Sequence, residues 1–330
     1  MKPLHVLGLV AATLLAFCIA AVTPTYGAPF GEVRFGAYVN PLGLSVVTGG
    51  KTPDIDDCSR TIRQLPAYLK QNGFYPRIDH CWINNGAVPG EKDPGLFPTD
   101  SARKAFALGI RLMMNLRCDT PARELSGVDD AYYRAFATAA KAFGHRVFLR
   151  KWEFNITDVH SCATQADPTG FIAAYRHEHD IFVAAGATNV RWVWAPAAPR
   201  VPAAVEKFYP GDDVVDEIMF DHYPSATSTA EEDFQAGPLP ANLAYWCNRG
   251  KLCGVAETAA LPENQPAYFA SVLAYLQGAP PPNFDMFLIF DTPSGPQGAR
   301  SLVQWQLTPA GAAAWRTLVT TVSPNSTPVP

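Results

Sequence analysis

Apolar stretches recur along the chain at intervals that suit alternating strands and helices. Eight of them are rich in the β-branched, aromatic and aliphatic residues that favour strands. Their starts lie 27 to 43 residues apart, as strand–helix units require, so the pattern predicts eight strands. They are VRFGAYVN (33–40), FYPRIDHCWI (74–83), RLMMNLRC (111–118), VFLRKWEFN (147–155), VRWVWAPA (190–197), EIMFDHYP (217–224), LCGVAET (252–258) and MFLIFDTP (286–293).

Helical spacing marks the segments between these strands. Apolar residues recur on one helical face over 62–69 and over 133–143, and Gly144 can end the second helix. Asp167-Pro168 and Thr308-Pro309 each combine an N-cap side chain with a proline at the first helical position. Eight strand–helix units predict an α/β fold, a (β/α)8 TIM barrel. The alternative is a doubly wound open sheet, whose glycine-rich first turn has no counterpart in GAYVNPLGL.

The N-terminal region has the features of a targeting signal. Lys2 precedes an apolar run from Leu4 to Val22, and TPTYGA follows, which is typical of a secretory signal peptide. A retained membrane anchor is the alternative, because the run approaches spanning length. We expect a signal peptide at 1–28, the (β/α)8 barrel at 29–320 and a disordered tail at 321–330. The mature protein would then be secreted, with no membrane contact after cleavage.

The cysteines agree with export. Six remain after Cys18 is removed with the signal, and none forms the CxxC pair of zinc or thioredoxin-like sites. An even number in an exported chain indicates disulfides, for which six cysteines allow 15 connectivities. The pairs that we expect are the short-range ones, Cys58–Cys81, Cys118–Cys162 and Cys247–Cys253.

Charge and motif content argue against several classes of function. The net charge is only −4 and no basic block occurs, which argues against nucleic acid or an anionic membrane as a partner. No cysteine cluster is available for a metal, and no G-x-S-x-G elbow of a serine hydrolase is found. We expect a monomer that needs no metal and no cofactor.

The carboxyl ends of the predicted strands carry polar and aromatic residues. Barrel enzymes place their active sites at this end. Trp82 and Trp194 fit either sugar stacking or core packing, and His80 fits either the cleft or a structural hydrogen bond. The candidates are Asn40, Asp79, His80, Trp82, Asn115, Arg117, Glu153, Asn155, Trp194, Asp221, His222, Tyr223, Glu257 and Asp291.

Two of these candidates are glutamates, Glu153 on the fourth strand and Glu257 on the seventh. Glycoside cleavage needs one carboxylic acid that protonates the leaving oxygen and one carboxylate on the other side of the sugar. The pair therefore indicates a glycoside hydrolase. For Glu153 alone, the alternative is a structural salt bridge with Arg150 or Arg117.

Several motifs resemble clan A glycoside hydrolases, and in particular family 26, which is known for β-mannanases and related β-glycanases. WEFN resembles the His-Glu-x-Asn around that family's acid/base, and VRWVWAPAAP resembles its fifth strand. KFYPGDDVVDEIMFDHYP resembles its Tyr-Tyr-Pro-Gly-Asp-Asp run, and KLCGVAETA resembles the end of its seventh strand. These matches cover residues 147–258, and the barrel rhythm extends over 33–320.

The resemblance implies a role for each matching residue. Glu153 would be the acid/base and Glu257 the nucleophile of a retaining, double-displacement reaction. Tyr223 would hydrogen-bond the nucleophile, and Asn155 would position the acid/base or the sugar. The other substrate-binding residues that we expect are Asp79, His80, Trp82, Asn115, Arg117, Trp194, Asp221 and Phe290.

The chain also departs from the family pattern. Trp152 replaces the histidine before the acid/base, and Arg150 lies three residues before Glu153, where the family has its arginine four residues before. Phe290 stands where a tryptophan platform is common. These departures bear on the mannan substrate and leave both glutamates in place.

The faces of the fourth strand follow from the assignment of Glu153. If this side chain points into the barrel, alternation places Val147, Leu149 and Lys151 inside as well. Phe148 and Trp152 would then face the helices. This interpretation offers no reason for a lysine in the barrel interior.

The sequence thus predicts a secreted retaining glycoside hydrolase that cleaves β-glycosidic bonds within a polysaccharide or oligosaccharide. Two alternatives remain open. One is a non-catalytic carbohydrate-binding protein on a decayed barrel, and the other is a clan A hydrolase of another family that acts on a different glycan.

Overall fold

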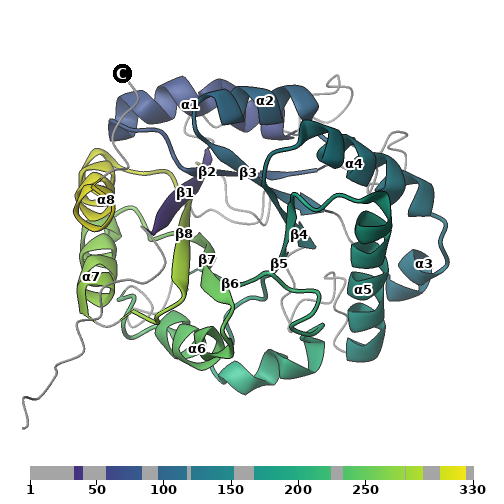
Figure 1. Cartoon of the computed structure of the whole chain (residues 1–330). Helices are drawn as coiled ribbons and strands as arrows, with labels where there is room; N and C mark the ends of the chain where they lie inside the picture. Colours follow the sequence, from purple (N-terminus) through teal and green to yellow (C-terminus); the bar gives the residue numbers. More distant parts are fainter. Residues whose placement is uncertain are drawn as a thin grey trace, which may run out of the picture.

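Eight parallel strands form a closed barrel at the centre of the molecule (Figure 1). The computed structural model describes residues 33–39, 57–83, 96–116, 120–151, 167–223, 233–278, 280–292 and 305–324. Strand order follows the sequence, and β8 pairs with β1 to close the barrel, which confirms the (β/α)8 prediction. The strands are β1 (Arg34–Val39), β2 (Ile78–Trp82), β3 (Arg111–Leu116), β4 (Val147–Lys151), β5 (Val190–Trp194), β6 (Glu217–His222), β7 (Leu252–Thr258) and β8 (Phe284–Asp291).

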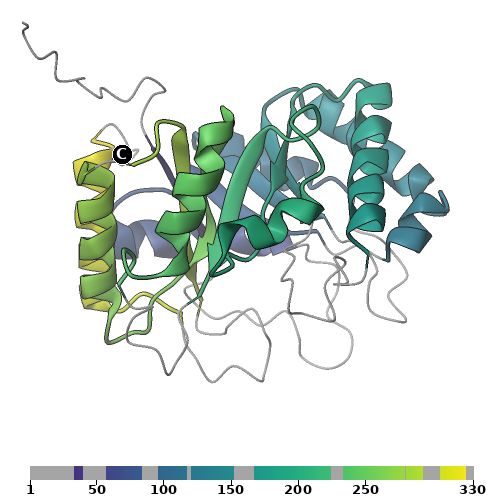
Figure 2. The same ribbon diagram turned by 90° about the horizontal axis from the view of Figure 1, so that it is seen from below.

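Helices surround the barrel and connect successive strands (Figures 1 and 2). The predicted caps are present, since the side chains of Asp167 and Thr308 each accept a hydrogen bond from a backbone N–H of the first turn. The connection from β5 to β6 is instead a 3-10 helix, η1 (Pro202–Phe208), in a proline-rich segment that disfavours a longer helix. The α-helices are α1 (Asp57–Asn72), α2 (Thr99–Ala107), α3 (Pro121–Leu125), α4 (Asp130–Phe143), α5 (Pro168–Ala185), α6 (Pro238–Trp246), α7 (Gln265–Gly278) and α8 (Pro309–Val322).

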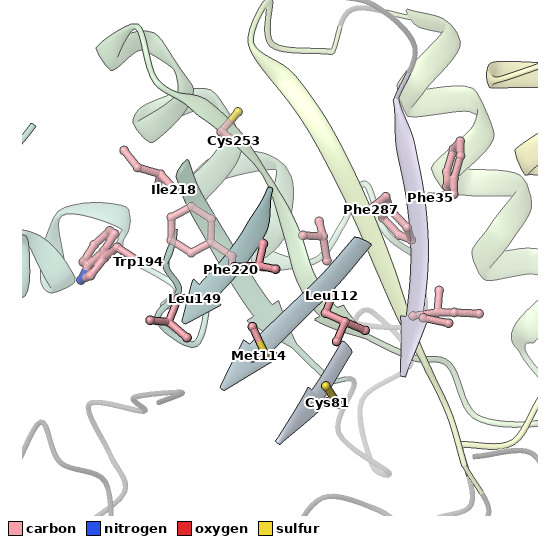
Figure 3. Close-up of a cluster of buried hydrophobic side chains, with 14 of the residues drawn as sticks. Phe35, Cys81, Leu112, Met114, Leu149, Trp194, Ile218, Phe220, Cys253 and Phe287 are labelled. Carbon is pink, nitrogen blue, oxygen red and sulfur yellow. The ribbon is translucent and has the colours of Figure 1, made fainter. Parts of the chain in front are cut away.

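The hydrophobic core has an outer layer between strands and helices and an inner layer inside the barrel. Phe35, Leu149, Phe220 and Phe287 belong to the outer layer (Figure 3). The inner layer consists of Ile78, Met113, Phe148, Val193, Ala195, Met219, Ala256, Met286 and Leu288. The inner layer fills the barrel below the carboxyl ends of the strands, so polar groups above it stand on an apolar floor.

Strand β4 corrects the expected faces. Phe148 lies inside the barrel, whereas Val147 and Leu149 lie in the outer layer. Lys151 also lies outside, where its ammonium group bonds Glu124 of α3 at 2.5 Å and Glu178 of α5 at 2.6 Å. The expected faces were counted in twos from an inward-pointing Glu153, and that count gave the opposite result for the residues of β4.

Two of the expected disulfides are present. Cys58–Cys81 joins α1 to β2, and Cys247–Cys253 joins the 3-10 helix η3 (Cys247–Arg249) to β7. The pair Cys118–Cys162, the signal segment 1–28 and the last six residues lie outside the described part of the chain. Within that part, no helix has both the length and the apolar character to cross a bilayer.

Candidate active site

Charged side chains from three strands meet inside the barrel at its carboxyl end. Arg150 on β4 is fully buried, and its Nη1 donates to Oε1 of Glu257 on β7 at 2.6 Å. Its Nη2 donates to Asp221 on β6. Asp221 and Glu257 are 2% and 1% exposed, so the guanidinium is their immediate counter-charge in a largely dehydrated site.

A β-bulge turns Glu257 into the barrel. Phe220 pairs with Val255, but the next residue, Asp221, pairs with Glu257, so β7 contains one extra residue. Ala256 belongs to the inner layer, and Glu257 next to it also contacts interior groups. Bulges re-aim side chains in this way, and without this one Glu257 would face the helices.

Tyr223, directly after β6, completes the support of Glu257. Its hydroxyl donates to Oε2 of Glu257 at 2.8 Å, so both carboxylate oxygens have a donor. The predicted contact between Tyr223 and Glu257 is therefore present. The two bonds fix the carboxylate in one orientation.

His80 and Asn115 lie beside this carboxylate. Burial, assisted by the charge of Arg150, lowers the pKa of His80 to about 4, although Glu257 opposes the shift. His80 is thus neutral near pH 7, and its Nε2 donates to Oδ1 of Asn115 at 3.0 Å. Nδ1 of His80 lies 3.7 Å from Oε1 of Glu257, and because the ring is neutral the two groups do not form an ion pair. In the described structure, His80 Nδ1 and Asn115 Nδ2 have no hydrogen-bond partner, and both could serve a hydroxyl-rich ligand.

An aromatic wall adjoins Tyr223. Tyr38 stacks on Phe290 with 4.5 Å between ring centroids, and Trp82 meets Tyr38 edge-on at 4.6 Å. Trp305 lies 5.2 Å from Tyr223. Trp82 and Tyr223 are half-buried, so the wall presents ring surface to the site.

Comparison with known proteins gives a fold and a partial sequence match. No family model matches the chain. A segment of 106 residues is 36% identical to Endoglucanase H from Acetivibrio thermocellus, and it covers 30% of this chain and 12% of that protein.

Solved structures match over much more of the chain. The catalytic domain of an endo-β-1,4-mannanase of glycoside hydrolase family 26 from Bacillus sp. JAMB-750 matches with TM-score 0.62, at 16% identity over 87% of this chain and 85% of that chain. A modular family 26 mannanase from Cellulomonas fimi matches with TM-score 0.61, at 18% identity over 89% of this chain and 71% of that chain. A Bacteroides ovatus β-mannanase of the same family matches with TM-score 0.58, at 12% identity over 89% of this chain and 90% of that chain. This chain has their fold.

The structure brings most predicted site residues together within this fold. Those gathered at the carboxyl end of the barrel are His80, Trp82, Asn115, Asp221, Tyr223, Glu257 and Phe290. Glu153, Asn155 and Arg117 lie outside the described residues.

Asp79 and Trp194 lie elsewhere. Asp79 faces α1, where Oγ1 of Thr61 donates to it at 2.7 Å, and burial raises its pKa to about 8. It precedes the inward His80, so alternation points it to the helices. Trp194 lies in the outer layer, with ring centroids 5.0 Å from Tyr209 and 4.7 Å from Trp246 (Figure 3). For Trp194, core packing is the correct alternative.

Sequence reasoning missed three members of the site. Arg150 entered as a possible partner of Glu153 and as an arginine shifted by one residue from the family pattern, but not as a site residue, because the faces of β4 were inverted. Tyr38 is one aromatic residue within the apolar run of β1, so nothing in the sequence distinguishes it. Trp305 comes well after β8 ends at Asp291, so the strand pattern offered no signal for it.

Proposed function

We propose that the protein is a secreted glycoside hydrolase that cleaves β-glycosidic bonds in a polysaccharide with retention of configuration. The observation that carries the proposal is Glu257, which a bulge aims into the mouth of the barrel and which Arg150 and Tyr223 hold by both oxygens. The fold shared with family 26 β-mannanases and the segment similar to Endoglucanase H support a glycan as substrate.

In this mechanism Glu257 attacks the anomeric carbon. The bond to the leaving oxygen breaks as Glu153 donates a proton to that oxygen, and a glycosyl–enzyme ester forms. Glu153 then removes a proton from water, which attacks the anomeric carbon and releases Glu257. Retaining enzymes of this type hold the two carboxyl groups about 5–5.5 Å apart.

The mechanism sets a geometric condition on β4. Arg150 points into the barrel and Lys151 points out, so unbroken alternation would send Glu153 outward. Glu153 can act on the substrate only if the alternation shifts by one residue after Lys151. On β7, the bulge at Ala256 and Glu257 shifts the alternation by one residue in this way.

The surrounding groups suit a sugar. The unpartnered Nδ1 of His80 and Nδ2 of Asn115 match ring hydroxyls, and the half-buried ring of Trp82 can cover an apolar sugar face. The two disulfides suit an oxidising compartment and support export.

Glu257→Gln and Glu153→Gln test the proposal against mannan, mixed-linkage glucan, xylan and arabinan. Each should lower kcat by at least about 10³-fold on the polymer that the native enzyme cleaves. Glu263→Gln, on an exposed residue six positions after Glu257, is the matched control and should keep full activity. NMR of the first product should show the substrate's anomeric configuration. Full activity of Glu257→Gln would refute the proposal.

A non-catalytic carbohydrate-binding protein is the second candidate. It is favoured by Trp152, which stands where the family has a histidine before its acid/base. Under this alternative the native protein binds one of the polymers but produces no new reducing ends from it.

A further inference from the structure

A cationic cavity lies at the amino end of the barrel, opposite the candidate active site. It has a volume of about 590 Å³, and all of its lining residues are in the described part of the chain. Those that matter here are Arg34, Arg77, Arg111, Arg146, His145 and Phe106. The amino end of such barrels is not where the family chemistry takes place, so this cavity needs a separate explanation.

The arginines gather because four neighbouring strands begin with one. Arg34 and Arg111 are the first residues of β1 and β3, while Arg77 and Arg146 directly precede β2 and β4. These strands are parallel and adjacent in the barrel, so their amino ends lie side by side (Figure 1). Residues 112 positions apart in the sequence thus contribute to one cavity.

The charges of this cavity are only partly balanced. Arg34 donates from Nε to Asp285 and from Nη2 to Glu217, each at 3.3 Å. Arg111 and Arg146 have no carboxylate partner within the described ranges. Within the described ranges, the three guanidinium groups of Arg34, Arg111 and Arg146 therefore face two carboxylates, which leaves an excess of positive charge.

A contrast comes from the next strand of the barrel. β5 also has an arginine near its start, Arg191, and this one is paired with Asp216 at 3.0 Å. The pKa of Arg111 is lowered by burial and further by the charges of Arg146 and Arg77, so these groups are close enough to repel one another. An anion placed between them would relieve that repulsion.

Aromatic contacts hold two of the donors, Arg111 and Arg34, in place. The Phe106 ring stacks on His145 with centroids 3.6 Å apart, and the Arg111 guanidinium lies 4.5 Å from the centre of the same ring. Arg34 lies 4.8 Å from the centre of the Phe148 ring, which belongs to the inner layer of the core. Stacked guanidinium groups lose little freedom when they bind a ligand, which favours a built site over a loose surface patch.

We propose that this cavity binds a phosphate or sulfate group, either as the free oxyanion or as part of a sugar-sized molecule. The planar forks of arginine match the oxygens of such groups and form paired, charge-assisted hydrogen bonds with them. The volume exceeds that of one oxyanion and lies in the usual range of small-ligand sites. The proposal does not depend on the glycoside hydrolase activity, because it uses none of the residues around Glu257.

Calorimetric titration at constant ionic strength tests the proposal with inorganic phosphate, inorganic sulfate, glucose 6-phosphate and glucose. We expect saturable binding of at least one of the anions and none of glucose. The double variant Arg111→Gln/Arg146→Gln should weaken anion binding at least about tenfold. Arg103→Gln on the exposed face of α2, outside the cavity, should bind as the native protein does.

The pattern of ligands separates the two sources of the anion. Tighter binding of glucose 6-phosphate than of inorganic phosphate supports a sugar-borne group, and the reverse supports the free oxyanion. If the double variant does not fold, Arg146→Gln alone gives the comparison, because its side chain is exposed. Absence of anion binding, or equal binding by the native protein and the variant, overturns the proposal.

Discussion

Replacement of Arg150 by methionine tests whether this residue is the counter-ion of the candidate active site. Methionine keeps an unbranched apolar stem but removes the charge and both hydrogen bonds. Asp221 and Glu257, at 2% and 1% exposure, would lose the cation that they share. Removal of one partner from a buried ion pair costs about 3–5 kcal/mol, and here two carboxylates are affected. The loss should reach the upper part of that range, a large share of the ~5–15 kcal/mol that keeps a domain folded.

Urea unfolding at pH 7 and pH 5 provides the assay. Carboxylates without their counter-ion bind protons more readily in the folded state than in the unfolded state. The stability deficit of Arg150→Met relative to the native protein should therefore shrink at the lower pH. Arg150→Lys, which keeps the charge, is the matched control and should lose less.

A double-mutant cycle separates the ion pair from general packing. Asp221→Asn should cost less in the Arg150→Met background than in the native protein, which would give a coupling free energy above about 1 kcal/mol. A deficit of Arg150→Met below about 1 kcal/mol, or additive effects of the two substitutions, would refute the reasoning.

Two further predictions concern Tyr223 and Asp79. Tyr223→Phe removes one hydrogen bond to Glu257 and should lower kcat about 10- to 100-fold on the native substrate with little change in urea stability, whereas an unchanged kcat would contradict the role of Tyr223. Burial raises the pKa of Asp79 from 3.8 to about 8, so the folded state holds this proton more tightly than the unfolded state. Stability from this group is present at low pH and should fall as pH rises from about 4 to about 8, by at most ~1.4 kcal/mol per pH unit. Asp79→Asn should flatten that part of the stability profile, and an unchanged slope would contradict the assignment.

Local patterns in the sequence determined the architecture. The apolar runs predicted all eight strands, because a strand buried on both faces needs a nearly continuous set of apolar residues. The side chains of Asp167 and Thr308 predicted where two helices begin, because capping depends only on nearby residues. Two disulfides were predictable from short separations, 23 and 6 residues. Each of these features depends on interactions between near neighbours in the chain.

The sequence did not determine which side of the barrel each side chain of a strand occupies. A shift of one residue reverses which side of the barrel a side chain occupies, and nothing in VFLRKWEFN indicates which alternate residues face inward. The bulge before Glu257 is of the same kind, because it depends on pairing with β6. For this reason the sequence prediction placed Lys151 inside the barrel and Arg150 outside it. The structure places the arginine inside with Glu257 and the lysine outside with Glu178.

Only closure of the barrel decided which distant charges meet. Arg150 and Glu257 are 107 residues apart, and the arginines that begin β1 to β4 are distributed over more than a hundred positions. Their encounter depends on strand order, register and twist, which are properties of the whole sheet. The sequence by itself therefore determined the helices and strands and indicated Glu257 as a candidate site residue. The tertiary structure determined which side chains support Glu257 at one end of the barrel and which arginines form a cationic cavity at the other.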